Sequence, residues 1–243
     1  MEQKKKKPIY GMTREQEREA SRLFGRHVSD AKALGLCLCS VLACASPMLL
    51  GLRLWEAIPP VVTTGLLSTE GVDDSMPRAM LVFAVPGLFC VLDLICHAQL
   101  WLHQRAQKLP PMPIRLTGRW TLPVLSVLLC AFWMKRAAGE TLSLAFYVPC
   151  LLALLLLLLG AHFFDCPRSE RFAFHLRAIE YKEAAWRRTH RLAGVCWMLG
   201  GLLLLALYFG TGRLPVFSAV PLLLLLLAPL PAAYVFAGKE KEA

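Results

Sequence analysis

Six long apolar runs constrain the fold of this chain more than any other feature of its sequence. The hydrophobic fraction of the 243 residues is 56% and the mean hydropathy is +0.51, which an ordinary soluble domain does not reach. A helix needs roughly 20 apolar residues to cross the hydrocarbon of a bilayer. Runs of about that length lie at 33–54, 79–101, 120–134, 142–164, 192–209 and 214–237. We therefore expect an all-α, polytopic membrane protein with about six transmembrane helices and amphipathic helices on the cytoplasmic side.

The distribution of basic residues predicts the orientation of these spans. Lys and Arg are retained on the cytoplasmic side of short loops, whereas acidic residues have little influence. With both termini inside, the outer side holds only five of the 27 Lys and Arg residues, namely Arg53, Arg78, Lys135, Arg136 and Arg213. We therefore expect the N- and C-termini in the cytoplasm and assign the net charge of +10 to this topology. Direct nucleic-acid binding is not expected, because the basic residues are dispersed over loops.

The predicted topology divides the chain into four segments. Residues 1–32 form a basic segment in which apolar residues recur at helical spacing, so a helix on the inner membrane surface is expected, with a solvated helix as the alternative. Residues 33–164 hold four membrane helices and an outer loop at 55–77. Residues 165–191 are predicted to form a cytoplasmic amphipathic helix, and residues 192–243 a C-terminal membrane hairpin.

The outer loop is rich in residues that favour turns and extended backbone. Ile58 and Pro59 begin an extended stretch, since a proline restricts the residue before it. Gly65, Asp73 and Asp74 lie in turn-forming sequences. A molecule arriving from outside meets this loop first, so these residues are the predicted outer contact site.

The second apolar run carries Asp93 and His97, which are four residues apart and therefore share one face of a helix. Ionisable residues at membrane depth are costly and usually face the protein interior. They mark relays, substrate paths or hydrogen bonds between helices. The pair is either a proton- or ligand-handling site or a structural contact near the inner interface.

Neither an enzyme nor a cofactor is predicted. The sequence lacks a zinc-protease helix, a phosphate-binding glycine loop and a hydrolase motif. His162, Asp165 and Cys166 have a spacing that could hold a metal, but polar residues are common at a helix end in the headgroup region. Most of the nine Cys lie in apolar runs and are interpreted as small hydrophobic residues. We therefore expect no catalytic residue, metal ion or cofactor.

An aromatic and basic motif directly precedes the fifth apolar run. It reads Trp186-Arg187-Arg188-Thr189-His190-Arg191-Leu192-Ala193-Gly194. Tryptophan and cationic side chains are favoured at the membrane surface, so the motif predicts a collar in the headgroup region. Such a collar either has a role in function or simply anchors the fifth span.

This motif resembles the C-terminal module of the SdpI family of bacterial integral membrane immunity proteins. The resemblance extends through Trp197-Met198-Leu199-Gly200-Gly201 to the proline-rich last run, which ends at Tyr234. The family-motif residues in this comparison are Trp186, Thr189, His190, Arg191 and Gly194. Many relatives also carry an N-terminal domain of unknown function with an outer Ile-Pro-x-His segment. The stretch from Ile58 to Gly65 is similar to that segment but lacks the His.

The resemblance implies a protein of the bacterial cell membrane that gives resistance to a secreted peptide toxin. It also implies that the protein senses the toxin and sequesters a cytoplasmic transcriptional repressor. The partners would be the lipid bilayer, a peptide toxin and a cytoplasmic transcriptional regulator. The alternatives are a small proton-coupled transporter, which would need Asp93, and a structural membrane subunit, which would need neither Asp93 nor His190.

Overall fold

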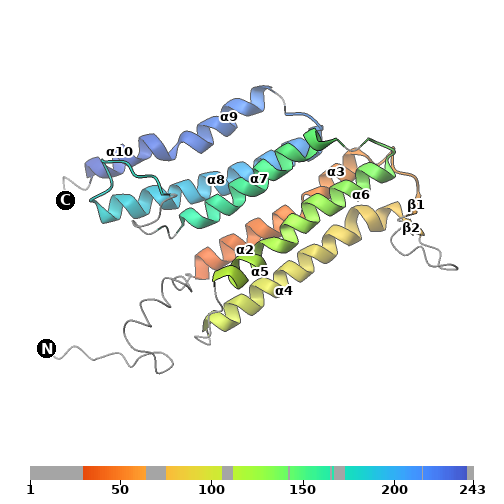
Figure 1. The fold of residues 1–243 in the computed structure, drawn as a ribbon, viewed down its shortest axis with the longest axis horizontal. Helices are drawn as coiled ribbons and strands as arrows, with labels where there is room; N and C mark the ends of the chain where they lie inside the picture. The colour runs from red at the N-terminus through yellow and green to blue at the C-terminus, as the bar shows by residue number, and fades with distance from the viewer. Residues whose placement is uncertain are drawn as a thin grey trace.

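Six helical stretches that are long and apolar enough to cross a membrane make up most of the structure (Figure 1). They are Asp30–Arg53, Met80–His103, Thr117–Ala137, Leu144–Phe163, Ala184–Thr211 and Ala219–Gly238. The structure is a computed structural model that describes residues 30–63, 75–105, 112–141, 143–164, 166, 173–214 and 216–239. Within these residues the predicted all-α, six-span membrane fold is confirmed. The surface helix predicted within residues 1–32 lies almost wholly outside the described residues.

Prolines shape the first three spans. The first span consists of α2 (Asp30–Ala45) and α3 (Pro47–Arg53), which separate where Pro47 lacks the N–H needed to continue the helix. The second consists of a wide π-helical segment, η2 (Met80–Ala84), and α4 (Val85–Arg105). The third consists of α5 (Met112–Leu125), the π-helical η3 (Ser126–Cys130) and α6 (Ala131–Ala137). Pro86 follows η2 closely and Pro123 precedes η3, so both wide turns lie where a backbone donor is missing.

The last three spans are α7 (Leu144–Phe163), α8 (Glu183–Thr211) and the pair α9 (Val216–Leu227) and α10 (Pro229–Lys239). The last span is interrupted just before Pro229, where α10 begins, whereas Pro221 lies inside α9. Helix α8 ends at Thr211, and the next residue, Gly212, has a φ of 74°, in the left-handed region that glycine adopts without strain.

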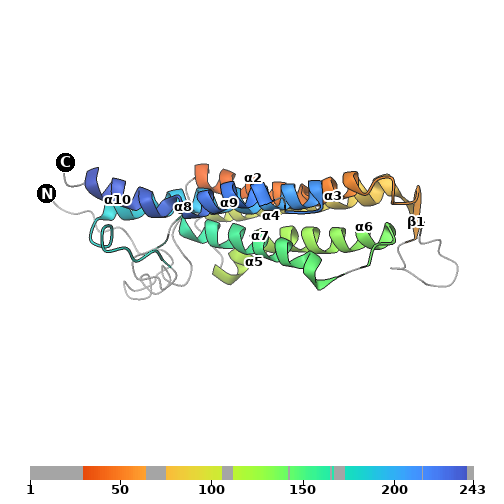
Figure 2. The same ribbon diagram turned by 90° about the horizontal axis from the view of Figure 1, so that it is seen from above.

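A short β-hairpin orders part of the predicted outer loop. Strands β1 (Val61–Thr63) and β2 (Ser75–Pro77) pair antiparallel, with Val62 opposite Met76. The hairpin lies at the end of the helical bundle opposite to α10 (Figure 2). We call this the hairpin end. The start of α2 and the end of α10 both lie toward the opposite end (Figure 1), as an even number of spans requires.

The helices pack in two groups. Helices α2, α4 and α5 pack against one another, and α7 packs most extensively against α8. Helix α8 also contacts α2, α3 and α10, so it joins the two groups. The α9–α10 span is the least buried of the six. In lipid, helices associate through close packing rather than hydrophobic burial, so the α7–α8 contact is the tightest link in the second group.

The segment before α8 differs from the prediction. The sequence predicts one amphipathic helix over residues 165–191, but the described residues 173–182 are not helical, with turns at 177–181, and the helix begins at Glu183. The Phe174 N–H donates to the ring of His190, and Ile179 is buried against Ala233 and Ala237 of α10. A short helix is only marginally stable by itself, so the contacts with His190 and α10 outweigh the helical preference of this segment.

Candidate functional site

The aromatic and basic residues of the Trp186–Gly194 motif lie on different faces of α8. Trp186, Thr189 and His190 are buried inside the protein. The three arginines of the motif, Arg187, Arg188 and Arg191, are exposed. The motif is therefore an internal aromatic contact with a basic outer face, and only its arginines are placed as a surface collar requires.

Both ring nitrogens of His190 have backbone partners. Nε2 accepts a hydrogen bond from the Phe174 N–H at 3.1 Å, and Nδ1 lies 2.9 Å from the carbonyl oxygen of Trp186. A neutral imidazole has one donor and one acceptor nitrogen. Since Nε2 accepts, the ring hydrogen lies on Nδ1 and is donated to Trp186. His190 is thus a fixed contact between α8 and the segment that precedes it.

Trp186 contacts two further segments, the residues after α7 and the end of α10, at the start of α8. Its Nε1–H donates to the carbonyl oxygen of Cys166 at 2.9 Å, and its ring stacks on His190 with centroids 4.1 Å apart. Trp186 also belongs to a buried cluster with residues of α10, where the Lys182 ammonium donates to the Ala237 carbonyl. The segment after α7 and the end of α10 are therefore both fastened to the start of α8.

His190 is surrounded by aromatic residues that the sequence prediction did not include. The ring centroid of Phe163, in α7, lies 5.0 Å from that of Trp197 and 4.9 Å from that of Phe174. The centroids of Phe163 and Phe174 lie 6.0 and 5.8 Å from that of the His190 ring. Phe163 and Phe174 are far from His190 in the sequence, so no helical spacing links them to it. Their aromatic character was the one available signal.

Asp93 and His97 meet a third residue in the protein interior. The Ser40 hydroxyl of α2 lies 2.6 Å from Asp93 Oδ2 and 2.9 Å from His97 Nε2, both on α4. Ser40 and Asp93 are fully buried, and His97 is 8% exposed. The sequence prediction named Asp93 and His97 but not Ser40. A polar residue within the first apolar run was the signal that could have indicated it.

This cluster differs from the triad of a serine hydrolase. In such a triad the histidine stands between serine and aspartate and takes the proton of the serine. Here Ser40 stands between the other two, and the closest His97–Asp93 approach is 3.9 Å. The three residues therefore form a serine-bridged polar contact between two membrane helices.

Arg78 holds the start of the outer loop. Its guanidinium donates to the carbonyl oxygens of Trp55 at 2.9 Å and Ile58 at 3.3 Å, and it lies 4.3 Å from the centroid of the Trp55 ring. Of the predicted outer contact residues, Ile58 is buried and Pro59 is exposed. Gly65, Asp73 and Asp74 lie outside the described residues.

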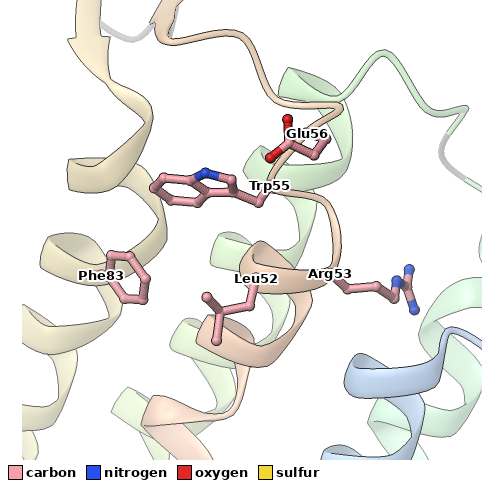
Figure 3. Close-up of a pocket in the computed structure, with 5 residues that line it drawn as sticks. All are labelled: Leu52, Arg53, Trp55, Glu56 and Phe83. Carbon is pink, nitrogen blue, oxygen red and sulfur yellow. The ribbon is translucent and has the colours of Figure 1, made fainter.

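A pocket of about 350 Å³ opens beside this loop at the hairpin end. It is lined by Leu52, Arg53, Trp55, Glu56 and Phe83. Figure 3 shows the Trp55 and Phe83 side chains on one side and the Arg53 guanidinium directed away from them. Arg53 donates to the Tyr208 carbonyl at the end of α8. The pocket is thus apolar and aromatic, with the Glu56 carboxylate at its rim.

Lys135 and Glu140 form a local ion pair at the hairpin end. Lys135 is buried, and its ammonium nitrogen lies 4.4 Å from the Phe146 ring centroid. At the opposite end, the Cys166 sulfur lies 3.9 Å from His162 Nε2, and Asp165 is outside the described residues. Among the described residues, no group of His, Cys, Asp or Glu could hold a metal ion.

The fold and these sites define a multi-pass integral membrane protein whose C-terminal helices are joined by a buried aromatic motif. Residues 171–236 match the model of the SdpI/YfhL protein family. The match confirms the resemblance predicted from the Trp186–Gly194 motif. It does not extend to the residues before 171, so the N-terminal resemblance stays a prediction. No curated protein and no solved structure matches the chain.

Proposed function

We propose that the protein is an immunity-type protein of the bacterial cell membrane that gives resistance to a secreted peptide toxin. The observation that carries this proposal is the SdpI/YfhL match, which covers the module containing the buried motif. The described sites contain polar contacts and a pocket but no arrangement typical of a known catalytic centre. The proposed activity is therefore binding rather than chemistry.

The pocket at the hairpin end is the proposed contact site for the toxin. Leu52, Trp55 and Phe83 offer apolar and aromatic surface, and Glu56 adds an exposed carboxylate. A membrane-active peptide combines apolar side chains with cationic ones, and it lies in the interface region. The predicted orientation places this pocket on the outer side.

The exposed arginines of α8 are the proposed cytoplasmic surface. Arg187, Arg188 and Arg191 lie next to the residues that fasten the start of α8 to the α10 end. A change at the hairpin end that moves α8 would alter how these arginines are presented. This surface would sequester a transcriptional repressor when the toxin is present, and its positive charge would favour an acidic partner.

Two other functions remain as candidates. A small proton-coupled transporter is favoured by the buried Asp93 and His97. A structural membrane subunit is the other candidate, and it would need neither Asp93 nor His190. The toxin experiment below separates both from immunity.

The test measures the survival and the membrane potential of a sensitive bacterium, with and without this protein. The cells are exposed to a membrane-disrupting peptide toxin secreted by the bacterium that makes this protein. Cells that express the protein are expected to survive and to keep their potential. The double variant Trp55→Ala, Phe83→Ala should lose protection, while Leu144→Ala, another exposed apolar residue at the hairpin end, should retain it. An absence of protection despite confirmed membrane insertion would refute immunity against that peptide.

A further inference from the structure

We propose that Ser40, Asp93 and His97 form a proton relay in the membrane interior, in which the Ser40 hydroxyl passes a proton between His97 and Asp93. The cluster lies outside the residues matched by the family model, and it does not depend on the proposed function. Its ligand would be a proton taken up from the predicted cytoplasmic side.

The geometry of the cluster allows transfer without movement of the helices. The Ser40 oxygen is within hydrogen-bond distance of both Asp93 Oδ2, at 2.6 Å, and His97 Nε2, at 2.9 Å. The direct His97–Asp93 separation of 3.9 Å is too long for a hydrogen bond. Ser40 is the described side chain that bridges the two, so it offers a direct route for a proton between them.

The Ser40 hydroxyl has one hydrogen, for which the Asp93 carboxylate at 2.6 Å and the Cys37 carbonyl at 3.0 Å are both acceptors, while the Ser40 oxygen can itself accept. In the ionic arrangement, His97 Nε2–H donates to Ser40, and Ser40 donates to the Asp93 carboxylate. Transfer breaks the His97 N–H bond and the Ser40 O–H bond, and it forms a new Ser40 O–H bond and an O–H bond on Asp93 Oδ2. The products are a neutral imidazole and a neutral carboxylic acid, with Ser40 unchanged in charge.

The second Asp93 oxygen, Oδ1, favours the protonated form of the carboxyl group. Asp93 Oδ1 is buried and has no hydrogen-bond partner among the described residues. An ionised carboxylate with an unpaired oxygen is far more costly in an apolar interior than a neutral carboxyl group. A static ion pair would leave this cost uncompensated, whereas the proton on Asp93 removes the charge.

The relay is accessible from one end. His97 lies one helical turn closer than Asp93 to the end of α4 that is opposite the hairpin, and it keeps some exposure whereas Asp93 has none. Toward the hairpin end, the described hydroxyls of Ser46 and Ser126 donate to the backbone carbonyls of Ala43 and Cys44, at 2.8 and 2.7 Å, and not to the cluster. Within the described helices the polar chain therefore stops at Asp93, which indicates a proton-binding site rather than a path across the membrane.

The groups that interact electrostatically with the cluster come from three helices. Cys37 and Cys44 of α2 and Cys90 of α4 interact with Asp93, and Arg119 of α5 interacts with His97. Arg119 is the permanently charged member of this set. A titration of the protein must therefore be assigned to Asp93 by substitution.

The test is infrared difference spectroscopy between acidic and alkaline buffer on the full-length protein in vesicles of phosphatidylethanolamine and phosphatidylglycerol. The wild-type protein is expected to show the carbonyl stretching band of a protonated carboxyl group that appears on acidification. The band should be lost in Asp93→Asn, which keeps the size of the side chain. It should persist in Asp30→Asn, which removes a carboxylate at the exposed start of α2.

A second variant tests the bridge itself. Ser40→Ala should shift the carboxyl band, because the hydrogen bond at 2.6 Å is lost, and should slow its response to a pH step on the side of the α2 start. A spectrum unchanged by Asp93→Asn would refute proton uptake by Asp93. If Asp93→Asn fails to fold, a carboxyl band that neither shifts nor slows in folded Ser40→Ala would refute the relay.

Discussion

At the scale of a single residue, His190 shows how one side chain fixes three parts of the chain. His190 lies on α8, where its ring accepts a hydrogen bond from the Phe174 N–H of the preceding segment and stacks on the Trp186 ring. The Trp186 Nε1–H in turn donates to the carbonyl oxygen of Cys166, which follows α7. Because both ring nitrogens are used, the ring is held in one tautomer and one orientation. A motif residue with the appearance of an interface anchor is therefore a buried structural contact.

Replacing His190 by alanine should destabilise the protein by about 1–3 kcal/mol, because the Phe174 N–H loses its acceptor and the stack on Trp186 is removed. Thermal unfolding of the purified protein in detergent measures this change. The neighbouring Arg191→Ala, on an exposed side chain, should change the unfolding free energy by less than about 0.5 kcal/mol. Equal stability of both variants would contradict the structural role of His190.

At the scale of the helices, the α7–α8 contact depends on glycines that let the two backbones approach. A Cβ at Gly194 would lie 2.9 Å from the Gly160 carbonyl oxygen and 2.7 Å from the Phe164 ring. A Cβ at Gly201 would lie 2.7 Å from the Ala153 carbonyl oxygen. Close approach of this kind is the main source of helix association in lipid.

Gly194→Ala should therefore destabilise the α7–α8 contact by about 1–3 kcal/mol, because the added methyl group collides with backbone atoms that have no room to move. Gly210→Ala is the matched control on the same helix, since a Cβ there has no described atom within 4 Å. The control should be neutral or slightly stabilising, as alanine favours helix. Unfolding in detergent compares the two, and an equal effect would exclude the close contact.

At the scale of the whole molecule, the arrangement of the helix ends constrains the topology. The start of α2 and the end of α10 lie toward one end, and the β-hairpin with Arg53 and Arg78 lies at the other (Figure 1). The positive-inside rule predicts that the hairpin end faces outward, because it carries few of the basic residues.

Alkaline phosphatase fusions test this orientation, since the enzyme is active only after export. A fusion placed after Gly139, in the turn that follows α6, should be active, and a fusion after Lys239, at the end of α10, should be inactive. A cytoplasmic reporter such as β-galactosidase should give the opposite pattern. If the Lys239 phosphatase fusion is active instead, the protein is inverted and the pocket at Trp55 faces the cytoplasm.

Much of the architecture could be predicted because it depends on local sequence. The thickness of the bilayer sets the length of an apolar run, so the six spans follow from hydropathy, and Pro229 interrupts the last of them because it has no N–H. The Trp186–Gly194 motif likewise predicted the family that the C-terminal region matches.

The amino-acid sequence by itself determined the membrane class, the number of spans and the Asp93–His97 face, because each depends on residues close together in the chain. Only the tertiary structure decided that Ser40 bridges this pair and that residues 173–182 turn toward His190 and α10 instead of forming a helix. Both outcomes depend on how separate helices are placed against one another, and helical periodicity records which face a residue occupies but not which helix that face will meet.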